Sequence, residues 1–276
     1  MFFKELYDYR YLLREIVAKN IKIQYRNSVL GVFWTLLQPL LTTLVLVLIF
    51  SEIFVRGRDY NFPIYLLCGR LLYEFYSQST KRAMRSVTGS ASVIKKVKVP
   101  KYIYPLSNII SNFITFLISM VVLMGFCIFF LLAPSAKNPP PVINHNLLYA
   151  PIPLLILFIM CMGVGLILST MAVFFKDIEY LYDVFCMLLF YSTPIIYDIN
   201  TQKNKGLLIA LKINPLYSII SMFRDCVMNG GADPARFPGW PFNPNHLLYS
   251  LACALGLLLL GGLIFWRKQD KFILHI

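Results

Sequence analysis

Residues 31–55 read GVFWTLLQPLLTTLVLVLIFSEIFV, an apolar stretch with a single charge at Glu52. A helix needs about 20 apolar residues to cross about 30 Å of hydrocarbon, so this stretch is long enough to span a bilayer. Further apolar segments follow at 62–80, 104–132, 150–175, 181–198 and 247–266. The pattern predicts an all-α integral membrane protein with six transmembrane helices. The second segment is the weakest, because it contains Arg70 and Glu74.

The composition of the whole chain supports the same class. Of the 276 residues, 58% are hydrophobic and 14% are charged, and the mean hydropathy is +0.66. Soluble domains are about 45–50% apolar and about 25% charged. These values exclude a soluble enzyme, a disordered chain and a coiled coil. The net charge of +13 therefore bears on orientation in a membrane and not on nucleic acid, for which we expect no role.

Basic residues are concentrated in alternate connecting segments. With the N-terminus inside, the inner segments are 1–28, 81–103, 176–180 and 267–276, and the region 81–103 has seven Lys and Arg residues and no acid. By the positive-inside rule, both termini are predicted to be cytoplasmic. Residues 1–28 interleave apolar and basic side chains, with Leu12, Ile16 and Ile23 near one helical face. This favours an amphipathic helix at the membrane surface over a solvated leader.

Two connecting regions predict additional helices. Residues 81–103 contain a short amphipathic helix from Ser86 to Ile94, followed by a basic turn. Residues 199–246 contain apolar runs at Leu207–Ile213 and Leu216–Met228, which are too short to span a bilayer. We expect these runs to form a re-entrant or interfacial helix pair on the outer side, ended by Asn229-Gly230-Gly231.

Motifs for catalysis are missing from the sequence. There is no GxxxxGK[ST] motif for binding ATP phosphates, and the three histidines have no spaced partner for metal binding or nucleophilic catalysis. The six cysteines form no CxxC pair and suit small buried side chains. We therefore expect no enzyme, no metal site and no cofactor in this chain.

Polar and aromatic side chains within the spans are candidate functional residues. Arg70 and Glu74 lie four residues apart, so they share a helix face, either as a functional site or as a neutralised structural pair, which we favour. Thr35, Gln38 and Thr42 form a stripe that faces either another helix or a water-filled path. A second stripe, on 104–132, favours helix packing. Aromatic residues along 181–198 face either a sliding glycan, whose C–H faces stack on rings, or lipid.

Several motifs resemble one known family. The stretch Tyr25–Trp34, YRNSVLGVFW, followed by Gln38-Pro39, resembles the start of permease subunits of type-2 ABC exporters of the polysaccharide branch. In the same order along the chain, four more stretches are similar to that family: KKVKVPK at 95–101 with Pro105, FFKDI at 174–178, STPIIY at 192–197, and Asn214-Pro215-Leu216 with Arg224. The charge at Arg70 departs from the family, whose members tend to be apolar there.

The resemblance implies a homodimeric permease in the bacterial cell (inner) membrane. Two copies of a separate cytoplasmic ATPase would bind ATP and Mg, and an undecaprenyl-type lipid-linked glycan (O-antigen, capsule or teichoic acid) would move to the outer face. The implied ATPase-coupling helix comprises Ser86, Val87, Thr88, Gly89, Ser90, Ala91, Ser92, Val93 and Ile94. The implied channel lining comprises Trp34, Thr35, Gln38, Thr42, Phe185, Phe190, Tyr191 and Tyr197. Head-group uptake would use Lys19, Lys22 and Arg26.

Three other functions remain open at this point. A type-2 ABC permease for drugs or small lipids has the same architecture. A membrane-embedded glycosyltransferase would need metal-binding acids, for which Asp177, Glu179 and Asp183 are the available cluster. An ion channel or self-contained carrier would function without an ATPase.

Overall fold

A computed structural model describes residues 7–26, 28–54, 61–97, 99–133, 145–197, 211–228 and 241–275. Within these ranges, every regular element is a helix, which confirms the predicted all-α class. Four helices there are long and apolar enough to cross a membrane, over Gly31–Phe50, Ile103–Leu132, Asn146–Phe174 and Pro244–His275. The predicted turn at Asn229-Gly230-Gly231 and the start of the run at Leu207 lie outside the described residues.

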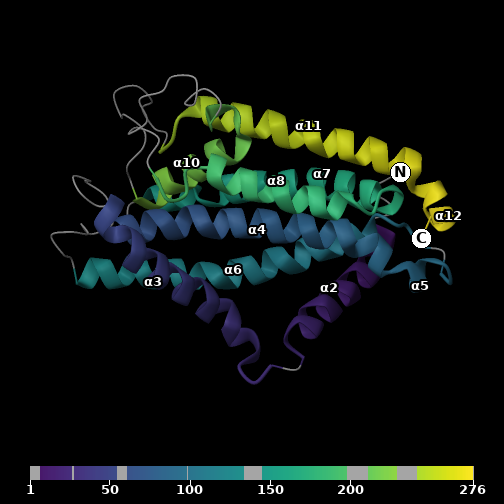
Figure 1. The fold of residues 1–276 in the computed structure, drawn as a ribbon, viewed down its shortest axis with the longest axis horizontal. Coiled ribbons are helices and arrows are strands. Elements are labelled where there is room, and N and C mark those ends of the chain that lie inside the picture. Colours follow the sequence, from purple (N-terminus) through teal and green to yellow (C-terminus); the bar gives the residue numbers. More distant parts are fainter. Residues whose placement is uncertain are drawn as a thin grey trace.

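Four long helices form the body of the molecule (Figure 1). They are α4 (Phe62–Gly89), α6 (Ile103–Leu132), α7 (Pro151–Phe174) and α11 (Pro244–Lys268). The most extensive packing joins α7 to α11, and α4 packs about equally on α6 and α7. Fully buried residues such as Leu67, Leu72, Leu157 and Cys161 form the core between them. The helix α4 therefore lies at the centre of the bundle.

An asparagine cap and a proline define where α4 and α11 begin. The Asn61 side chain accepts a hydrogen bond from the backbone N–H of Ile64, and Pro63 lies in the first turn of α4. Asn243 caps α11 in a similar way, ahead of Pro244. An Asn cap satisfies an N–H group that has no partner within the helix, and proline at the first positions forfeits no helical hydrogen bond.

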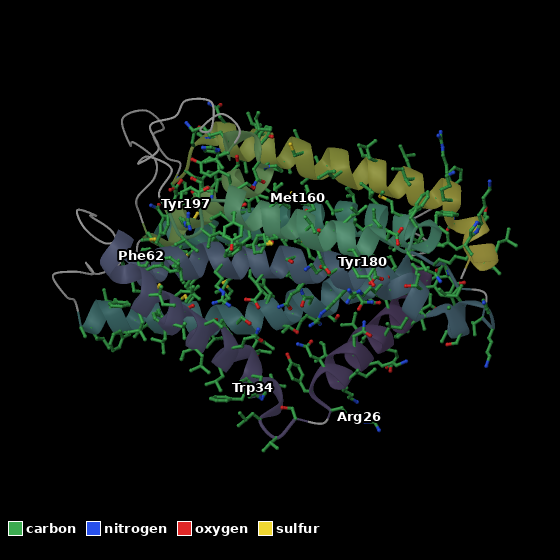
Figure 2. All side chains as sticks on the ribbon, viewed as in Figure 1. Arg26, Trp34, Phe62, Met160, Tyr180 and Tyr197 are labelled. Carbon is green, nitrogen blue, oxygen red and sulfur yellow. The ribbon has the colours of Figure 1, made fainter. Side chains whose placement is uncertain are left out.

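The first two helices form a V that leans away from the bundle (Figure 1). They are α2 (Arg10–Tyr25) and α3 (Trp34–Phe54), the latter preceded by a short 3-10 turn, η1 (Gly31–Phe33). Arg26 and Trp34 mark the point of the V (Figure 2). Gly31 there has φ of 50°, a left-handed conformation that glycine adopts without steric cost. The tight reversal between the two helices thus depends on this glycine.

The structure corrects one detail of the predicted amphipathic helix. Leu12 and Ile16 of α2 pack against the buried cluster that contains Ile94 and Phe272. Ile23, which was predicted to share their apolar face, is exposed instead. The reason is that the last turn of α2 presents Gln24 to the bundle instead, where its side-chain oxygen accepts a hydrogen bond from Arg82 of α4 over 2.9 Å, so that Ile23 lies on the outer face.

The fifth predicted span is shorter in the structure than expected. The helix α8 (Ile178–Ser192) has 15 residues, a length of about 22 Å at about 1.5 Å per residue. It is too short to cross about 30 Å of hydrocarbon alone. Thr193 is extended, with φ of −95° and ψ of 127°, because the residue before a proline is disfavoured in the helical region. The helix α10 (Pro215–Met228) packs against α11, α4 and α7.

The predicted helix Ser86–Ile94 is not one helix. Ser86 to Gly89 form the last turn of α4, the helix ends at Ser90, and a separate short helix, α5 (Ala91–Ile94), follows. Ser86 and Val87 are buried, since α4 remains inside the bundle to its last turn. The C-terminal elements η4 (Gln269–Lys271) and α12 (Phe272–His275) lie at the same end as α5 (Figure 1).

Candidate functional site

A polar stripe on α4 forms the floor of the candidate site. Arg70, Glu74 and Gln78 are spaced four residues apart, which places them above one another on one helix face. The Gln78 amide nitrogen donates to Glu74 Oε1 over 3.0 Å, and Arg70 Nε lies 3.9 Å from Glu74 Oε2. The other faces of α4 are buried in the core. The stripe is thus the face of α4 that the bundle leaves uncovered.

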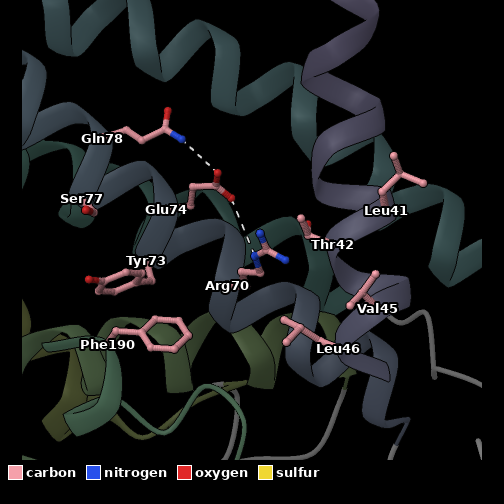
Figure 3. A pocket seen from close by; sticks show the side chains of 10 residues that line it. All are labelled: Leu41, Thr42, Val45, Leu46, Arg70, Tyr73, Glu74, Ser77, Gln78 and Phe190. Atoms are coloured by element: carbon pink, nitrogen blue, oxygen red, sulfur yellow. Dashed lines mark hydrogen bonds and ion pairs between the residues drawn. The ribbon is translucent and has the colours of Figure 1, made fainter. Parts of the chain in front are cut away.

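A cavity of about 610 Å³ lies over this stripe (Figure 3). The helices α3, α4 and α8 supply its walls. Its apolar and aromatic lining is Leu41, Val45, Leu46, Tyr73 and Phe190, and its polar lining is Thr42, Arg70, Glu74, Ser77 and Gln78. The Phe190 ring meets the Tyr73 ring edge to face, with centroids 5.1 Å apart. We call this cavity the α4 cleft.

A second cavity of about 90 Å³ adjoins the α4 cleft. Glu74 and Gln78 line both cavities, and Gln38 of α3 donates to Glu74 Oε1 over 3.4 Å. The second cavity continues between the V-shaped helix pair and α6, where Trp34 and Tyr25 line it. A path with polar side chains therefore runs from the point of the V to the α4 cleft.

The predicted stripe on α3 divides between the two alternatives left open. Thr35 is buried, and its backbone oxygen accepts from Ser119 of α6 over 3.0 Å, so this position packs against a helix. Thr35 also lines the second cavity, together with Gln38, and Thr42 lines the α4 cleft. Trp34 lines the second cavity and stays 45% exposed. The second predicted stripe, on α6, serves packing only in part: Asn112 donates to Ser79 over 2.7 Å, but Asn112, Thr115 and Ser119 also line the second cavity.

The aromatic residues of α8 also divide into separate groups. Phe190 lines the α4 cleft, whereas Phe185 and Tyr191 are exposed outside it. Tyr182 is buried, and its hydroxyl donates to Thr80 Oγ1 over 2.7 Å, so it joins α8 to α4. Tyr197 lies beyond the helix, where its hydroxyl donates to the Tyr191 backbone oxygen over 3.0 Å. The structure therefore brings one of the predicted aromatics, Phe190, into the α4 cleft.

Two ion pairs hold α8 beside α4. Lys81 Nζ lies 2.7 Å from Asp183 Oδ1, and Arg85 Nε lies 2.9 Å from Glu179 Oε2. The Tyr73 hydroxyl of α4 also donates to the Cys186 backbone oxygen, and Tyr182 and Cys186 share a small buried cluster with α4 and α7, whereas most of the outer face of α8 is exposed. Glu179 and Asp183, two of the acids considered as metal ligands, are thereby each engaged by a cation.

Arg224, which the sequence marks only as part of a motif, holds the segment that follows α8 in place. Arg224 of α10 is buried and stacks on the Tyr65 ring, with its guanidinium carbon 3.4 Å from the centroid. Its nitrogens donate to the backbone oxygens of Tyr65, Pro194 and Ile195 over 3.2, 2.7 and 3.1 Å. The Pro194 and Ile195 carbonyl groups, just past the end of α8, thus find a charged donor, which also contacts the first turn of α4 at Tyr65. The Asn-Pro motif contributes too, as Asn214 donates to Thr193 over 2.9 Å.

The predicted coupling segment has an anchored side and an exposed side. Ile94 of α5 is buried in a cluster with Val87, Tyr102 and Phe272, which joins α2, α4, α7, α11 and α12. Ser92 and Val93 are exposed, as are Lys95 to Val97 after the helix. Lys19, Lys22 and Arg26, the predicted head-group residues, are also exposed. They line neither cavity.

These features define a class: a multi-pass helical membrane protein with a partly polar cleft between its helices. Residues 11–228 match the family described as ABC-2 type transporter, and the chain belongs to this family. It is 31% identical to the O-antigen export system permease protein RfbA of Klebsiella pneumoniae, over 79% of this chain and 81% of that protein. The relative of the same name from Myxococcus xanthus is 28% identical, over 80% and 82%.

A relative with another printed cargo matches over a similar length. The polysialic acid transport protein KpsM of Escherichia coli is 23% identical, over 78% of this chain and 80% of that protein. The matched region in each case covers most of both chains. The similarity thus extends across the helices that form the α4 cleft and is not confined to one motif.

Proposed function

We propose that this chain is the permease subunit of an ATP-driven exporter that moves lipid-linked polysaccharide from the cytoplasmic to the outer face of the bacterial cell (inner) membrane. The observation that carries the proposal is the α4 cleft, which combines aromatic and polar walls in a family whose relatives are named for export of O-antigen and polysialic acid. Glycans need both kinds of wall, because they present apolar C–H faces and many hydroxyl groups. The undecaprenyl type of lipid carrier is part of this proposal.

A second copy of the chain completes the path in this proposal. The outer faces of α3 and α8 expose large apolar residues, including Leu48, Val184 and Leu188. The cleft opens between these two helices, where a single copy would present Arg70 and Glu74 to lipid. A homodimer packed through α3 and α8 would close the cleft and leave a channel between the copies.

Two copies of a separate ABC ATPase drive transport in this proposal, and the nucleotide and its Mg bind there. The docking segment is α5, which exposes Val93 and, just beyond it, Val97 between basic side chains. Because Ile94 is anchored in the cluster shared by α2, α4 and α7, a push on α5 reaches the helices that border the path. The start of α2 and the end of α12 lie at this end (Figure 1), and both termini are cytoplasmic in the proposal, in line with the positive-inside rule.

In this proposal, the export path of the glycan begins at exposed cationic side chains. Lys19, Lys22 and Arg26 attract the anionic head group of the lipid-linked glycan at the inner leaflet. The rival glycosyltransferase function is disfavoured, since Glu179 and Asp183 are held by Arg85 and Lys81 rather than gathered for a metal. The drug or small-lipid permease remains the second candidate within the family.

The experiment replaces the chromosomal copy with a tagged one and follows the cell's surface polysaccharide. Loss of the chain should abolish surface glycan and cause lipid-linked glycan to accumulate inside. A Val93→Asp variant should keep the protein in the membrane but lose the co-purifying ATPase, whereas Leu248→Asn, on an exposed face of α11, should retain it. Normal surface glycan together with a changed drug tolerance would favour the second candidate and contradict polysaccharide export.

A further inference from the structure

The guanidinium group of Arg70 lacks sufficient partners within the part of the chain that the structure describes. Its Nη1 is buried and makes no hydrogen bond there. Its Nε lies 3.9 Å from Glu74 Oε2, which is beyond hydrogen-bonding distance. The side chain is only 17% exposed. A cation with unused donors so deep among apolar helices is costly, and this cost marks intramembrane ionisable residues as functional candidates.

Glu74 does not compensate for this deficit. Its Oε1 accepts hydrogen bonds from Gln78 at 3.0 Å and from Gln38 at 3.4 Å, so two amides from two helices hold the carboxylate in place. Figure 3 shows the Arg70 guanidinium between Glu74 and Thr42, inside the cleft. The ion pair therefore orients Arg70 without using up its five N–H donors.

The surroundings of Arg70 fit one class of ligand. Tyr73 and Phe190 present rings to the cleft, and Leu41, Val45 and Leu46 line the α3 side. The volume of about 610 Å³ lies within the range of about 300–1,000 Å³ typical of small-molecule sites. A sugar ring offers C–H groups to the negative faces of aromatic rings and oxygens to a planar fork of donors.

We propose that the α4 cleft is a glycosyl-binding subsite in which Arg70 donates hydrogen bonds to oxygens of one sugar unit while Tyr73 and Phe190 contact its apolar face. This proposal rests on the proposed function and adds a residue that contacts the substrate. Arg70 acts as the fixed polar contact between apolar walls, so successive sugar units pause there as the chain advances. Glu74, Gln38 and Gln78 are positioning residues for that contact.

A purely structural ion pair predicts different behaviour. Replacing a buried pair by apolar residues of similar volume is often neutral or stabilising, because both desolvation penalties disappear. An Arg70→Met, Glu74→Met double variant should therefore fold as well as the native protein under either interpretation. Under ours, the double variant loses glycan binding and export, and Arg70→Lys, which keeps the charge but loses the fork, recovers only part of both.

The test uses the full complex with its ATPase in lipid nanodiscs. Fluorescent maltoheptaose, which offers hydroxyl groups alone, and a sialic acid heptamer, which adds carboxylates, serve as probes, and binding is measured by anisotropy. Loss of the Arg70 donors should weaken binding by about tenfold or more, because hydrogen bonds to charged groups contribute about 1.5–3 kcal/mol. A preference for one probe identifies hydroxyl or carboxylate oxygens as the acceptors. The matched control is Arg82→Met, which removes a cation from the same helix but lines neither cavity.

Two outcomes separate the proposals. If the native complex exports and binds glycan and the Met–Met double variant does so equally well, the subsite proposal is wrong and the pair is structural. If the native complex neither binds either probe nor exports glycan in cells, the proposed function itself fails. A selective loss in the Arg70 variants, with thermal stability retained and Arg82→Met unaffected, supports the subsite.

Discussion

Replacing Gly261 by alanine should destabilise the protein, whereas the same change at the neighbouring Gly262 should not. A Cβ at Gly261 would overlap the backbone oxygen of Gly163 and lie 3.3 Å from Ile167 Cγ1. A Cβ at Gly262 would meet nothing within 4 Å. The contrast arises because α7 and α11 cross with their backbones in contact at Gly163 and Gly261, as small residues allow in membrane helices.

The magnitude follows from two opposing effects. Overpacking costs about 1–3 kcal/mol, and the upper end applies at Gly261 because the obstacle is backbone and cannot rotate away. At either position, alanine in place of glycine stabilises the helix by up to about 1 kcal/mol. The two variants should therefore differ by about 3 kcal/mol. At about 2–4 °C per kcal/mol, their melting temperatures should differ by about 6–12 °C, with Gly261→Ala the lower.

The chain contains its own reporter for this measurement. Cys68, Cys127, Cys161, Cys186 and Cys226 are buried free thiols, so a thiol-reactive fluorescent dye reports unfolding in mild detergent. Gly163→Ala should behave like Gly261→Ala, since its Cβ would lie 2.5 Å from the Leu257 carbonyl carbon. Equal melting temperatures for Gly261→Ala and Gly262→Ala would refute the close crossing of α7 and α11.

Three further predictions use the same assay. Arg224→Met removes three charged hydrogen bonds to backbone oxygens, so it should lower the melting temperature more than any exposed substitution. A melting temperature equal to that of Gly262→Ala would contradict the anchoring role. Burial raises the pKa of Asp225 from 3.8 to about 7, against the opposing effect of Arg224. The folded state then holds a proton that the unfolded state releases, so stability should fall as pH rises from about 4 to above 7, and Asp225→Asn should flatten that dependence. Lys81→Asp should lower the free energy of unfolding by about 1 kcal/mol or less, because the ion pair with Asp183 is partly exposed. The charge swap Lys81→Asp, Asp183→Lys should restore that stability. A swap variant no more stable than Lys81→Asp would argue against the contact.

Hydropathy was sufficient to predict most of the helices, because membrane length fixes how long an apolar run must be. It was insufficient for α8, where Pro194 ends the helix before the apolar sequence ends. It also placed the end of the second span at residue 80, although α4 continues to Gly89. Helix propensity and core packing, which hydropathy does not measure, keep the last turns of α4 helical although they contain basic residues.

The candidate site was predictable in part, from spacing alone. Four-residue intervals placed Arg70 beside Glu74, and the α3 stripe placed Gln38 and Thr42 together. Periodicity could not decide which neighbour each stripe faces, since that depends on how helices pack. Thus the Thr35 backbone oxygen accepts from Ser119 of α6 while the Gln38 side chain reaches Glu74, and Tyr182 is buried although it lies among exposed aromatics. Arg224 was recognisable in its motif, but its partners are carbonyl groups without a sequence signal.

The position of Arg70 constrains what can occupy the α4 cleft. A charged residue at the centre of a membrane helix costs about 2.5–3.5 kcal/mol, and lipid chains offer no acceptor for its donors. Within the part of the chain that the structure describes, protein partners are insufficient too, because Glu74 Oε1 accepts from Gln38 and Gln78 and Glu74 Oε2 lies 3.9 Å from Arg70 Nε. The remaining acceptors are water and the hydroxyl-rich cargo. In the proposed subsite, water would occupy the resting cleft, and the glycan would exchange for that water at little net cost in hydrogen bonds. A site that held the sugar more tightly would slow its release, so one under-partnered arginine between apolar walls suits passage better than a fully polar cleft.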